Sequence, residues 1–372
     1  MKILVVPDKF KGTLTARVAA EAIARGWLAV RPDDPLGLLP MSDGGDGFGE
    51  VLAKLLGAKP QTTVTIDAAH RPLKARWWWV GKNKTALIES AQVIGLALLP
   101  PGKFHPFKLD TSGLGKIFQA AIKRGAKQIL IGIGGSATND GGFGLARSLG
   151  WKFFDARGNE IKNWTSLAAL KTIRKPLRTK FPRVIVAVDV QNSLLGKAGA
   201  TRIYGRQKGL RAEDFELAEN CLRRLASVCS GGLRPPLKWR RSQSAATIPG
   251  DGAAGGLGFG LRFFLDAKLE HGFEIFSRHA SLPERIRRAD LVITGEGAID
   301  RQTFMGKGAG EVFKLCSRLR VPCVALAGKA EAAIKKFPVR AILPGLATAR
   351  DAQTNAAFYL SKLAARVAAE QS

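Results

Sequence analysis

Residues 132–144 read GIGGSATNDGGFG, and this glycine-rich stretch directly follows an apolar run, QILI (128–131). A short apolar run that ends in glycines and small polar residues is typical of a buried strand leading into a ligand-binding turn. The first part of the turn, Gly132-x-Gly134-x-x-Ala137, fits the dinucleotide fingerprint. Asp140 lies between the later glycines, where its charge would repel a pyrophosphate unless a cation bridged the two. The stretch therefore predicts an α/β fold and leaves open whether the ligand is a dinucleotide or a phosphate held with a cation.

Strands and helices elsewhere in the chain favour the same fold class. The chain opens with a short apolar strand, KILVVP (2–7), a charged loop and an amphipathic helix, and the alternation of strand and helix returns from Thr111 onward. Apolar strands without polar alternation, such as RVIVAVDV (183–190), are typical of parallel sheets covered by helices. The segments 61–68 and 74–81 instead read as strands of an antiparallel or mixed sheet. We therefore expect an α/β protein with parallel and mixed sheets.

Similar units of strand, loop and helix at the two ends of the chain predict a domain built from both termini. We expect a discontinuous Rossmann-like domain of residues 1–62 plus 286–372 and an inserted α/β domain of residues 63–285. With 372 residues, the chain is long enough for each domain to bury its own core. Residues 230–248 are rich in glycine, proline and arginine and are predicted to form a long surface loop. The three tryptophans at 77–79 are predicted to pack on both faces of a strand.

The composition limits the class of protein. No apolar run approaches the roughly 20 residues that a membrane helix needs, and the apolar start MKILVV is too short for a signal peptide, so we expect a cytoplasmic protein without a membrane partner. The four cysteines lack C-x-x-C spacing, which indicates buried free thiols. The formal net charge of +28 is spread along the chain, so we expect a basic surface that attracts anionic small molecules, with no nucleic-acid partner. A nucleic-acid-binding protein stays the non-enzymatic alternative.

Four glycine-rich segments share one pattern, a strand followed by glycines with acids or hydroxyls and then a helix. They are MSDGGDGFG (41–49), GGSATNDGG (134–142), PGDGAAGGLGFG (249–260) and TGEGAIDRQTFMGKG (294–308). Glycine lets the backbone approach a ligand closely, and exposed amides at a helix N-terminus suit phosphate. In open α/β sheets such loops lie at the carboxyl ends of the strands, where ligands bind. The repeated pattern indicates a phosphorylated ligand with a divalent cation.

Phosphoryl transfer needs cationic groups on the phosphates, a carboxylate for Mg²⁺ and a carboxylate that orients or deprotonates the accepting hydroxyl. Asp189 ends an apolar strand and is our best candidate for the base or a metal ligand. Lys9 and Lys11 follow the first strand and could hold an anionic substrate. Glu296 and Asp300 are further candidates for Mg²⁺. This set of residue types suits Mg²⁺-ATP.

An NAD-dependent oxidoreductase that uses Gly132–Ala137 is the alternative enzyme class. Asp155 follows a predicted strand at the distance where a ribose-binding acid belongs. Against this alternative, residues 139–142 interrupt the start of the helix that the fingerprint requires. No G-x-x-x-x-G-K-[ST] motif occurs, so a P-loop is excluded.

The order of the motifs resembles the bacterial type 1 glycerate kinases, which phosphorylate glycerate with ATP. The resemblance runs over nearly the whole chain and is carried by PDKFKGTLTA, PMSDGGDG, ESAQVIGLALL, GIGGSATNDGG, DVQNSLLGKAGA, PGDGAAGGLG and DLVITGEGAIDRQT-x₂-GK. It implies two α/β domains with a cleft between them, one formed from both ends of the chain and the other inserted. The implied activity is phosphorylation of D-glycerate by ATP with Mg²⁺, and the resemblance favours 2-phosphoglycerate as the product. It leaves a homodimer open.

Several positions depart from the pattern of this family. The family pattern D-x-D-N-P-L reads DVQNSL here, with Gln191 in place of the second aspartate and Ser193 in place of proline. T-T-S-x-G-T-G reads DTSGLG, with Leu114 in place of a threonine, and F-G-x-Q-K-G reads YGRQKG (204–209). Gln191 removes a carboxylate from the metal site that the resemblance implies. Asp189 is then the remaining carboxylate of this motif for the metal.

The resemblance and the loop chemistry together give the expected site. Asp189, Lys11 and Lys9 are the expected catalytic residues, and Asp189, Glu296 and Asp300 the expected metal ligands. The expected phosphate- and nucleotide-binding residues are Gly134, Gly135, Ser136, Thr138, Asn139, Gly141, Gly142, Gly252, Gly255 and Gly256. Asp43, Asp46 and Ser112 are expected to bind substrate.

Overall fold

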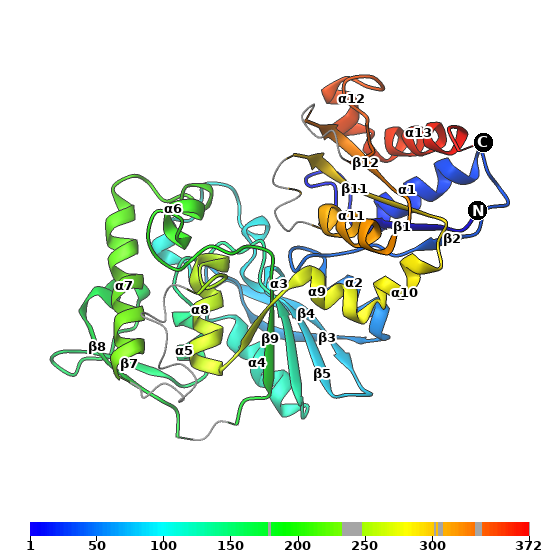
Figure 1. Cartoon of the computed structure of the whole chain (residues 1–372). Coiled ribbons are helices and arrows are strands. Elements are labelled where there is room, and N and C mark those ends of the chain that lie inside the picture. Colours follow the sequence, from blue (N-terminus) through cyan, green and yellow to red (C-terminus); the bar gives the residue numbers. More distant parts are fainter. Residues whose placement is uncertain (178–179, 233–247, 301–302, 304–307, 332–336, 372) are drawn as a thin grey trace. The chain divides into compact units, whose positions relative to one another are not determined.

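The computed structural model describes residues 1–177, 180–232, 248–300, 303, 308–331 and 337–371 (Figure 1). Its contacts divide the chain into two compact units, and each is described by itself. The terminal unit consists of Met1–Asp43 and Gly272–Ser372, and the inserted unit consists of Gly44–His271. The α/β class predicted from the sequence is confirmed in both units.

The terminal unit contains a parallel sheet and its helices. Its elements are β1 (Ile3–Pro7), α1 (Ala16–Leu28), β2 (Leu36–Leu38), α9 (Gly272–His279), α10 (Leu282–Arg287), β11 (Leu291–Ile299), α11 (Gly308–Leu319), β12 (Cys323–Ala330), β13 (Val339–Ala341), α12 (Ala349–Thr354) and α13 (Ala356–Ala369).

The sheet of the terminal unit joins both ends of the chain. Its strand order is β13-β12-β11-β1-β2, and every neighbouring pair is parallel. The apolar residues of β1 are buried, as a parallel strand covered on both faces requires. Helices α1 and α13 pack against each other, and their apolar faces share one core with β1 and β11 (Figure 1). This sheet therefore places the carboxyl ends of β1 and β11 side by side, with Pro7 opposite Gly295.

The inserted unit contains a mixed sheet and a separate hairpin. Its elements are α2 (Phe48–Leu56), β3 (Lys59–Ile66), β4 (Pro72–Val80), β5 (Thr85–Glu89), α3 (Ala91–Ile94), α4 (Leu114–Lys123), β6 (Gln128–Gly132), α5 (Phe143–Ser148), β7 (Lys152–Asp155), β8 (Leu170–Arg174), β9 (Arg183–Val188), α6 (Ala200–Tyr204), α7 (Asp214–Gly232), α8 (Ala253–Leu265) and β10 (Lys268–His271).

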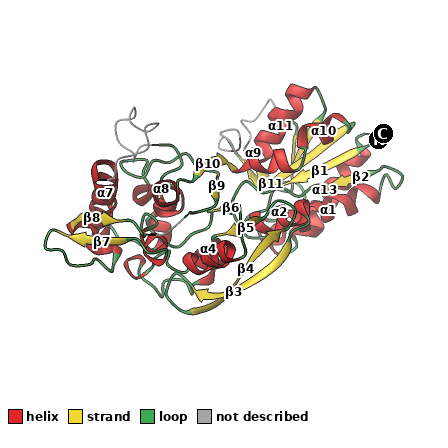
Figure 2. Ribbon diagram, turned by 90° about the horizontal axis from the view of Figure 1, so that it is seen from below, coloured by secondary structure: helices red, strands yellow, loops and turns green. Residues whose placement is uncertain are grey.

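The mixed sheet has the order β10-β9-β6-β5-β4-β3 (Figure 2). The strands from β10 to β5 run parallel, whereas β4 pairs antiparallel with both β5 and β3. Trp77 and Trp78 on β4 are buried and Trp79 is half-buried, as expected for tryptophans that pack on a strand. Strands β7 and β8 lie between β6 and β9 in the sequence, but they pair only with each other as a separate antiparallel sheet.

The boundary between the units differs from the one expected from the sequence. Helix α2 packs on β4, β5 and β6, and Phe48 in that helix is buried against the end of β6. Helix α9 packs on α10 instead. The contacts therefore divide the chain after Asp43 and after His271, whereas the sequence suggested divisions after 62 and 285.

Other expectations bear on the composition and the loops. All four cysteines are free and buried, which confirms the prediction for them. Within the described residues, no helix is both long enough and apolar enough to cross a membrane. Most of the predicted surface loop at 230–248 lies outside the described residues, and so does part of the glycine-rich segment 294–308. Helix α7 extends to Gly232.

Candidate functional site

The glycine turn after β6 packs closely against the turn before α2. The amide of Gly134 donates to the carbonyl of Gly44 at 3.3 Å, and a Cβ on Gly134 would lie 2.6 Å from Cα of Gly45. A Cβ on Gly135 would lie 2.3 Å from a carboxylate oxygen of Asp46. Only glycine allows two backbones to approach in this way. The structure therefore brings Gly134 and Gly135 together with Asp46 at the carboxyl end of the sheet.

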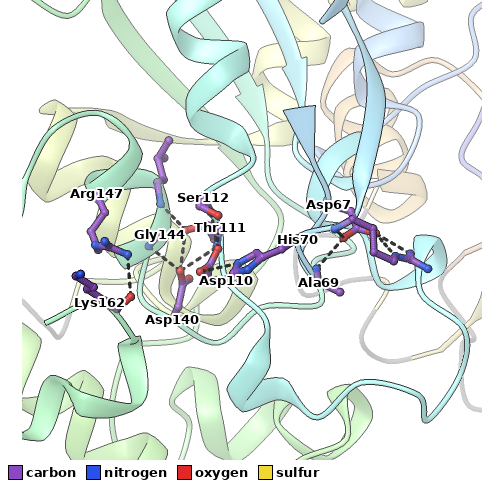
Figure 3. Close-up of polar contacts among 12 residues, drawn as sticks. Asp67, Ala69, His70, Asp110, Thr111, Ser112, Asp140, Gly144, Arg147 and Lys162 are labelled. Atoms are coloured by element: carbon purple, nitrogen blue, oxygen red, sulfur yellow. Dashed lines mark hydrogen bonds and ion pairs between the residues drawn. The ribbon is translucent and has the colours of Figure 1, made fainter. Parts of the chain in front are cut away.

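Asp140, in the second half of this turn, is an internal anchor (Figure 3). Its side chain has 0% exposure, and Oδ2 accepts hydrogen bonds from the backbone N–H and the hydroxyl of Thr111 and from the N–H of Gly144. Oδ1 accepts from the N–H of Gly142 at 3.1 Å. Burial, and then the carboxylate of Asp110, raise the pKa of Asp140 to about 6 against these donors. The interpretation that Asp140 faces a cation is wrong, because its oxygens hold the start of α5 and the turn at Thr111.

Ser112 lies next to this anchor. Its hydroxyl donates to Oδ1 of Asp110 at 2.5 Å, and its N–H donates to the same oxygen at 2.8 Å. Oδ2 of Asp110 in turn lies 3.0 Å from Nε2 of His70 (Figure 3). The carboxylate of Asp110 thus holds Ser112, and the carboxylate of Asp140 holds the neighbouring residue, Thr111.

A second glycine turn, which begins α8, packs directly on the first. The N–H of Gly141 donates to the carbonyl of Gly255, and a Cβ on Gly255 would lie 2.0 Å from the carbonyl oxygen of Thr138. Gly142 meets Gly260 in the same way, with 2.8 Å between a Cβ on Gly142 and Cα of Gly260. The expected phosphate-binding glycines of the two turns are therefore close together, and part of their role is to let the two backbones meet.

The backbone at the start of α8 has an unusual conformation. Ala254, Gly255 and Gly256 have φ values of 55°, 69° and 88°. A left-handed conformation is strained for alanine, and such residues concentrate at functional sites. Nearby, Arg262 and Asp251 form a buried bidentate ion pair of 2.7 and 2.6 Å, which ties the turn to its helix. The turn is held in this conformation by its own helix.

Asp189 directly follows β9, as expected from the sequence, and is half-buried. Burial and the charge of Asp189 raise the pKa of the Tyr204 hydroxyl to about 12. That hydroxyl donates to Oδ1 of Asn192 at 2.5 Å, and the carbonyl of Asn192 accepts the N–H of Gly252 at 2.9 Å. Asp189 therefore lies in one connected group with the turn that begins α8.

Lys208 is a residue of this region that was not among the expected site residues. It closes a short 3₁₀ turn, Arg206–Lys208, and its side chain is only 6% exposed. Its ammonium donates to the hydroxyl of Ser136 at 3.1 Å and to the carbonyl of Thr138 at 2.7 Å. Burial lowers the pKa of Lys208 to about 7, against the opposing charge of Asp140. The motif YGRQKG contained the only sequence signal for it.

In the terminal unit, several expected residues gather at the carboxyl ends of β1 and β11. Asp8 follows β1 and is buried beside Asp43, Lys9 and Glu296. Burial, followed by the charges of Asp43 and Glu296, raises the pKa of Asp8 well above its usual value, although Lys9 opposes this shift. Asp8 was not expected, but its place as the first acid after the first strand could have indicated it.

Two further expected residues, Lys11 and Asp300, come after the same two strands, β1 and β11. The backbone of Lys11 lies beside Gly297 of β11, since a Cβ on Gly297 would be 3.2 Å from its nitrogen, and its side chain is exposed. Asp300 follows β11, and its carboxylate accepts the N–H of Thr303 at 3.1 Å. Glu296 and Asp300 thus belong to the terminal unit, whereas Asp189 belongs to the inserted unit.

The sequence profile described as the glycerate kinase family matches residues 3–371. The chain belongs to this family. It is 35% identical to the glycerate kinase of Bacillus subtilis (strain 168), over 99% of this chain and 97% of that protein. It is 39% identical to the glycerate 2-kinase of Escherichia coli (strain K12), over 88% of this chain and 85% of that protein.

A solved structure agrees with this assignment. A crystal structure from Salmonella typhimurium LT2, described as a glycerate kinase 2, matches with a TM-score of 0.80 at 33% identity and covers 100% of this chain and 98% of that one. The resemblance noted in the sequence is thereby confirmed. As a member of the glycerate kinase family the protein is an enzyme, a phosphotransferase.

The carboxylates of the terminal unit have donor chemistry that suits a divalent cation. Within the described part of the chain, no three His, Cys, Asp or Glu side chains are grouped so that they could hold a metal ion by themselves. Mg²⁺ in nucleotide enzymes commonly needs only one or two carboxylates, because phosphate oxygens and waters complete its shell. The crowding of Asp8, Asp43 and Glu296 concentrates negative charge that such a cation would offset.

The structure gives the NAD alternative no support. Strand β7, which carries Asp155, pairs only with β8 and is absent from the sheet that contains β6. The carboxylate of Asp155 instead accepts the N–H groups of Arg157 and Asn159 in its own turn. Asp155 therefore does not lie on a parallel strand next to β6, which is where the ribose-binding acid of a dinucleotide site belongs.

Proposed function

We propose that this enzyme transfers the γ-phosphoryl group of ATP to a hydroxyl of D-glycerate and releases ADP. The family match over residues 3–371 carries the proposal, because it spans both units and all of the glycine turns. The crowded carboxylates at the ends of β1 and β11 suit the cation of Mg²⁺-ATP. The relatives named glycerate 2-kinase and glycerate kinase 2 favour 2-phosphoglycerate as the product.

The described geometry supports distinct roles for the residues of the inserted unit. The turns at 134–142 and 252–256 would bind phosphates, through the backbone groups of Gly135, Ser136, Thr138, Asn139 and Gly255. The amides of Gly134, Gly141, Gly142, Gly252 and Gly256 already donate within the protein, so these glycines would shape the turns. Asp189 would orient the hydroxyl of glycerate or hold the cation, and Asp46 and Ser112 would bind substrate.

The residues of the terminal unit would supply charge. Lys11 and Lys9 would neutralise the anionic substrate, and Asp43 would contact it. Glu296 and Asp300 would hold Mg²⁺, which offsets the charge of the phosphates. A homodimer and a cytoplasmic location stay predictions of the sequence.

A coupled assay of ADP release with D-glycerate, ATP and Mg²⁺ tests the proposal. We expect ADP formation that depends on all three components, and ³¹P NMR of the product should show 2-phosphoglycerate. A product of 3-phosphoglycerate would overturn the assignment of the hydroxyl only. Absence of turnover, together with NADH binding in a fluorescence titration, would overturn the proposed reaction.

A further inference from the structure

Lys208 is a buried cation that has no ion-pair partner among the described residues. Within the described residues, no carboxylate lies at ion-pair distance from its ammonium, and its partners are the neutral oxygens of Ser136 and Thr138. Asp140 is the carboxylate that acts on it, but both oxygens of Asp140 accept hydrogen bonds from other groups. A buried charge without a paired counter-charge costs folding free energy. A contribution to the stability of the fold therefore does not explain why a lysine occupies this buried position.

The surroundings of this ammonium have spare hydrogen-bonding capacity. An ammonium carries three N–H donors, and two of them have partners among the described residues. Two buried oxygens of the turn that Lys208 contacts, Thr138 Oγ1 and Asn139 Oδ1, have no hydrogen-bond partner in the described part of the chain. Such groups are expected to be satisfied in the working protein.

The residues that Lys208 holds are those of the first glycine turn. Ser136 and Thr138 are separated from Lys208 by 72 and 70 positions in the sequence, so the contact is a tertiary link between the turn after β6 and the 3₁₀ turn before Gly209. The bond to the carbonyl of Thr138 fixes the peptide that precedes Asn139. A positive charge placed behind a phosphate-binding turn would favour the negative charge that develops in phosphoryl transfer.

We propose that Lys208 is a positioning residue of the proposed phosphoryl transfer, which fixes the turn at Ser136–Thr138 and supplies it with a positive charge. The inference rests on the proposed function and adds a residue that acts through the turn. The third N–H of Lys208 and the hydroxyl of Thr138 are then satisfied by waters that accompany the phosphorylated ligand in the turn.

The test compares Lys208→Met and Lys208→Gln with the wild-type enzyme. Met keeps the length of the side chain without charge, and Gln keeps a donor for the carbonyl of Thr138 without charge. Lys116→Met, on the exposed face of α4, is the matched control and should behave like the wild type. kcat and KM for ATP and for D-glycerate are measured together with the melting temperature of each protein.

We expect both Lys208 variants to lose about 100-fold in kcat/KM for ATP, mainly in kcat, with KM for glycerate within about twofold of wild type. Their melting temperatures should not fall below that of the wild type, since an isolated buried charge has been removed. If Lys208→Met does not fold, Lys208→Gln decides the question.

Two results would overturn the inference while leaving the proposed function intact. One is a Lys208 variant with kcat/KM for ATP within about threefold of the wild type. The other is a large fall in melting temperature with unchanged kinetic constants of the folded enzyme, which is the behaviour of a purely structural residue. A wild-type enzyme without turnover would refute the proposed function, and the inference with it.

Discussion

Asp140 shows how much a single buried side chain holds together. Its two oxygens accept four hydrogen bonds, which fix the start of α5 and the turn at Thr111. Carboxylates that accept several backbone N–H bonds are strong structural anchors, because charge-assisted hydrogen bonds exceed neutral ones in strength. The first glycine turn therefore owes its shape to a residue that the sequence suggested for a cation.

Asp140→Asn should destabilise the protein by about 3 kcal/mol, because an amide NH₂ would face backbone donors in a buried site. Thermal or urea unfolding measures the loss. Asp155→Asn is the control, because Asp155 also accepts backbone N–H groups but in an exposed turn, and we expect a change within about 1 kcal/mol. Equal losses in the two variants would contradict the anchor role.

Asp189 is the residue on which the proposed chemistry depends most. Asp189→Asn should lower kcat by about two or more orders of magnitude, in line with the contribution of a general base, and leave the melting temperature nearly unchanged. The coupled ADP-release assay gives kcat. Near-normal turnover would remove Asp189 from the mechanism.

Lys208 makes stability depend on pH in a direction opposite to that of a paired lysine. Its folded-state pKa of about 7 lies below the usual lysine value of 10.5. At a pH between these two pKa values, the side chain is protonated in the unfolded state but neutral in the folded state. The resulting penalty is complete below about pH 7 and disappears as the pH rises toward about 10. Lys208→Met removes the penalty.

The stability of Lys208→Met relative to the wild type should therefore be most favourable near pH 7 and decline by pH 9.5. The difference in melting temperature between the two proteins at each pH measures this, because other titrating groups affect both proteins alike. A difference that does not vary with pH would show that the buried ammonium titrates normally.

At the scale of elements, the two glycine turns act as a pair. Thr138, Gly141 and Gly142 of one turn meet Gly255, Gly256 and Gly260 of the other at backbone-to-backbone distances. The many glycines of these motifs serve packing between the turns as well as the proposed binding of phosphate. The sequence indicated each turn, because glycines after an apolar run are a local signal, but it did not indicate that the turns pack on each other.

Gly255→Ala should cost about 3 kcal/mol, because the new methyl group would meet the carbonyl oxygen of Thr138 at 2.0 Å in addition to the strain of a positive φ. Gly158→Ala is the matched control, since Gly158 also has a positive φ of 82° but has no atom within 4 Å of a new Cβ among the described residues. We expect it to lose only about 1 kcal/mol in urea unfolding. Equal losses would show that the contact between the turns relaxes easily.

At the scale of the whole molecule, each unit has its own hydrophobic core. The inserted unit is one continuous segment, Gly44–His271, and helix α2 covers part of its sheet. Trp78 of β4 packs on Gly49 of α2, where an added Cβ would lie 2.0 Å from the indole ring. A domain boundary placed within β3 would separate α2 from the sheet of the inserted unit that it covers.

A fragment of residues 44–271 should therefore fold alone with a cooperative thermal transition and a dispersed NMR spectrum. A fragment of residues 63–285, which follows the boundary expected from the sequence, should aggregate or unfold without cooperativity, because it loses α2 and half of β3. Circular dichroism and NMR of both fragments make the comparison. Equal stability of the two would favour the boundary expected from the sequence.

The sequence by itself determined the α/β class, the glycine turns at strand ends, the positions of Asp189 and Lys9, and the family. These depend on local signals, namely apolar runs, turn residues and the order of motifs along the chain. Only the tertiary structure decided that Asp140 is an internal anchor, that Asp8 is crowded by Asp43 and Glu296, and that α2 belongs to the inserted unit. It also decided that Lys208 is buried behind a turn 70 residues away. Burial and hydrogen-bond partners depend on contacts between distant parts of the chain, so no local pattern in the sequence specifies them.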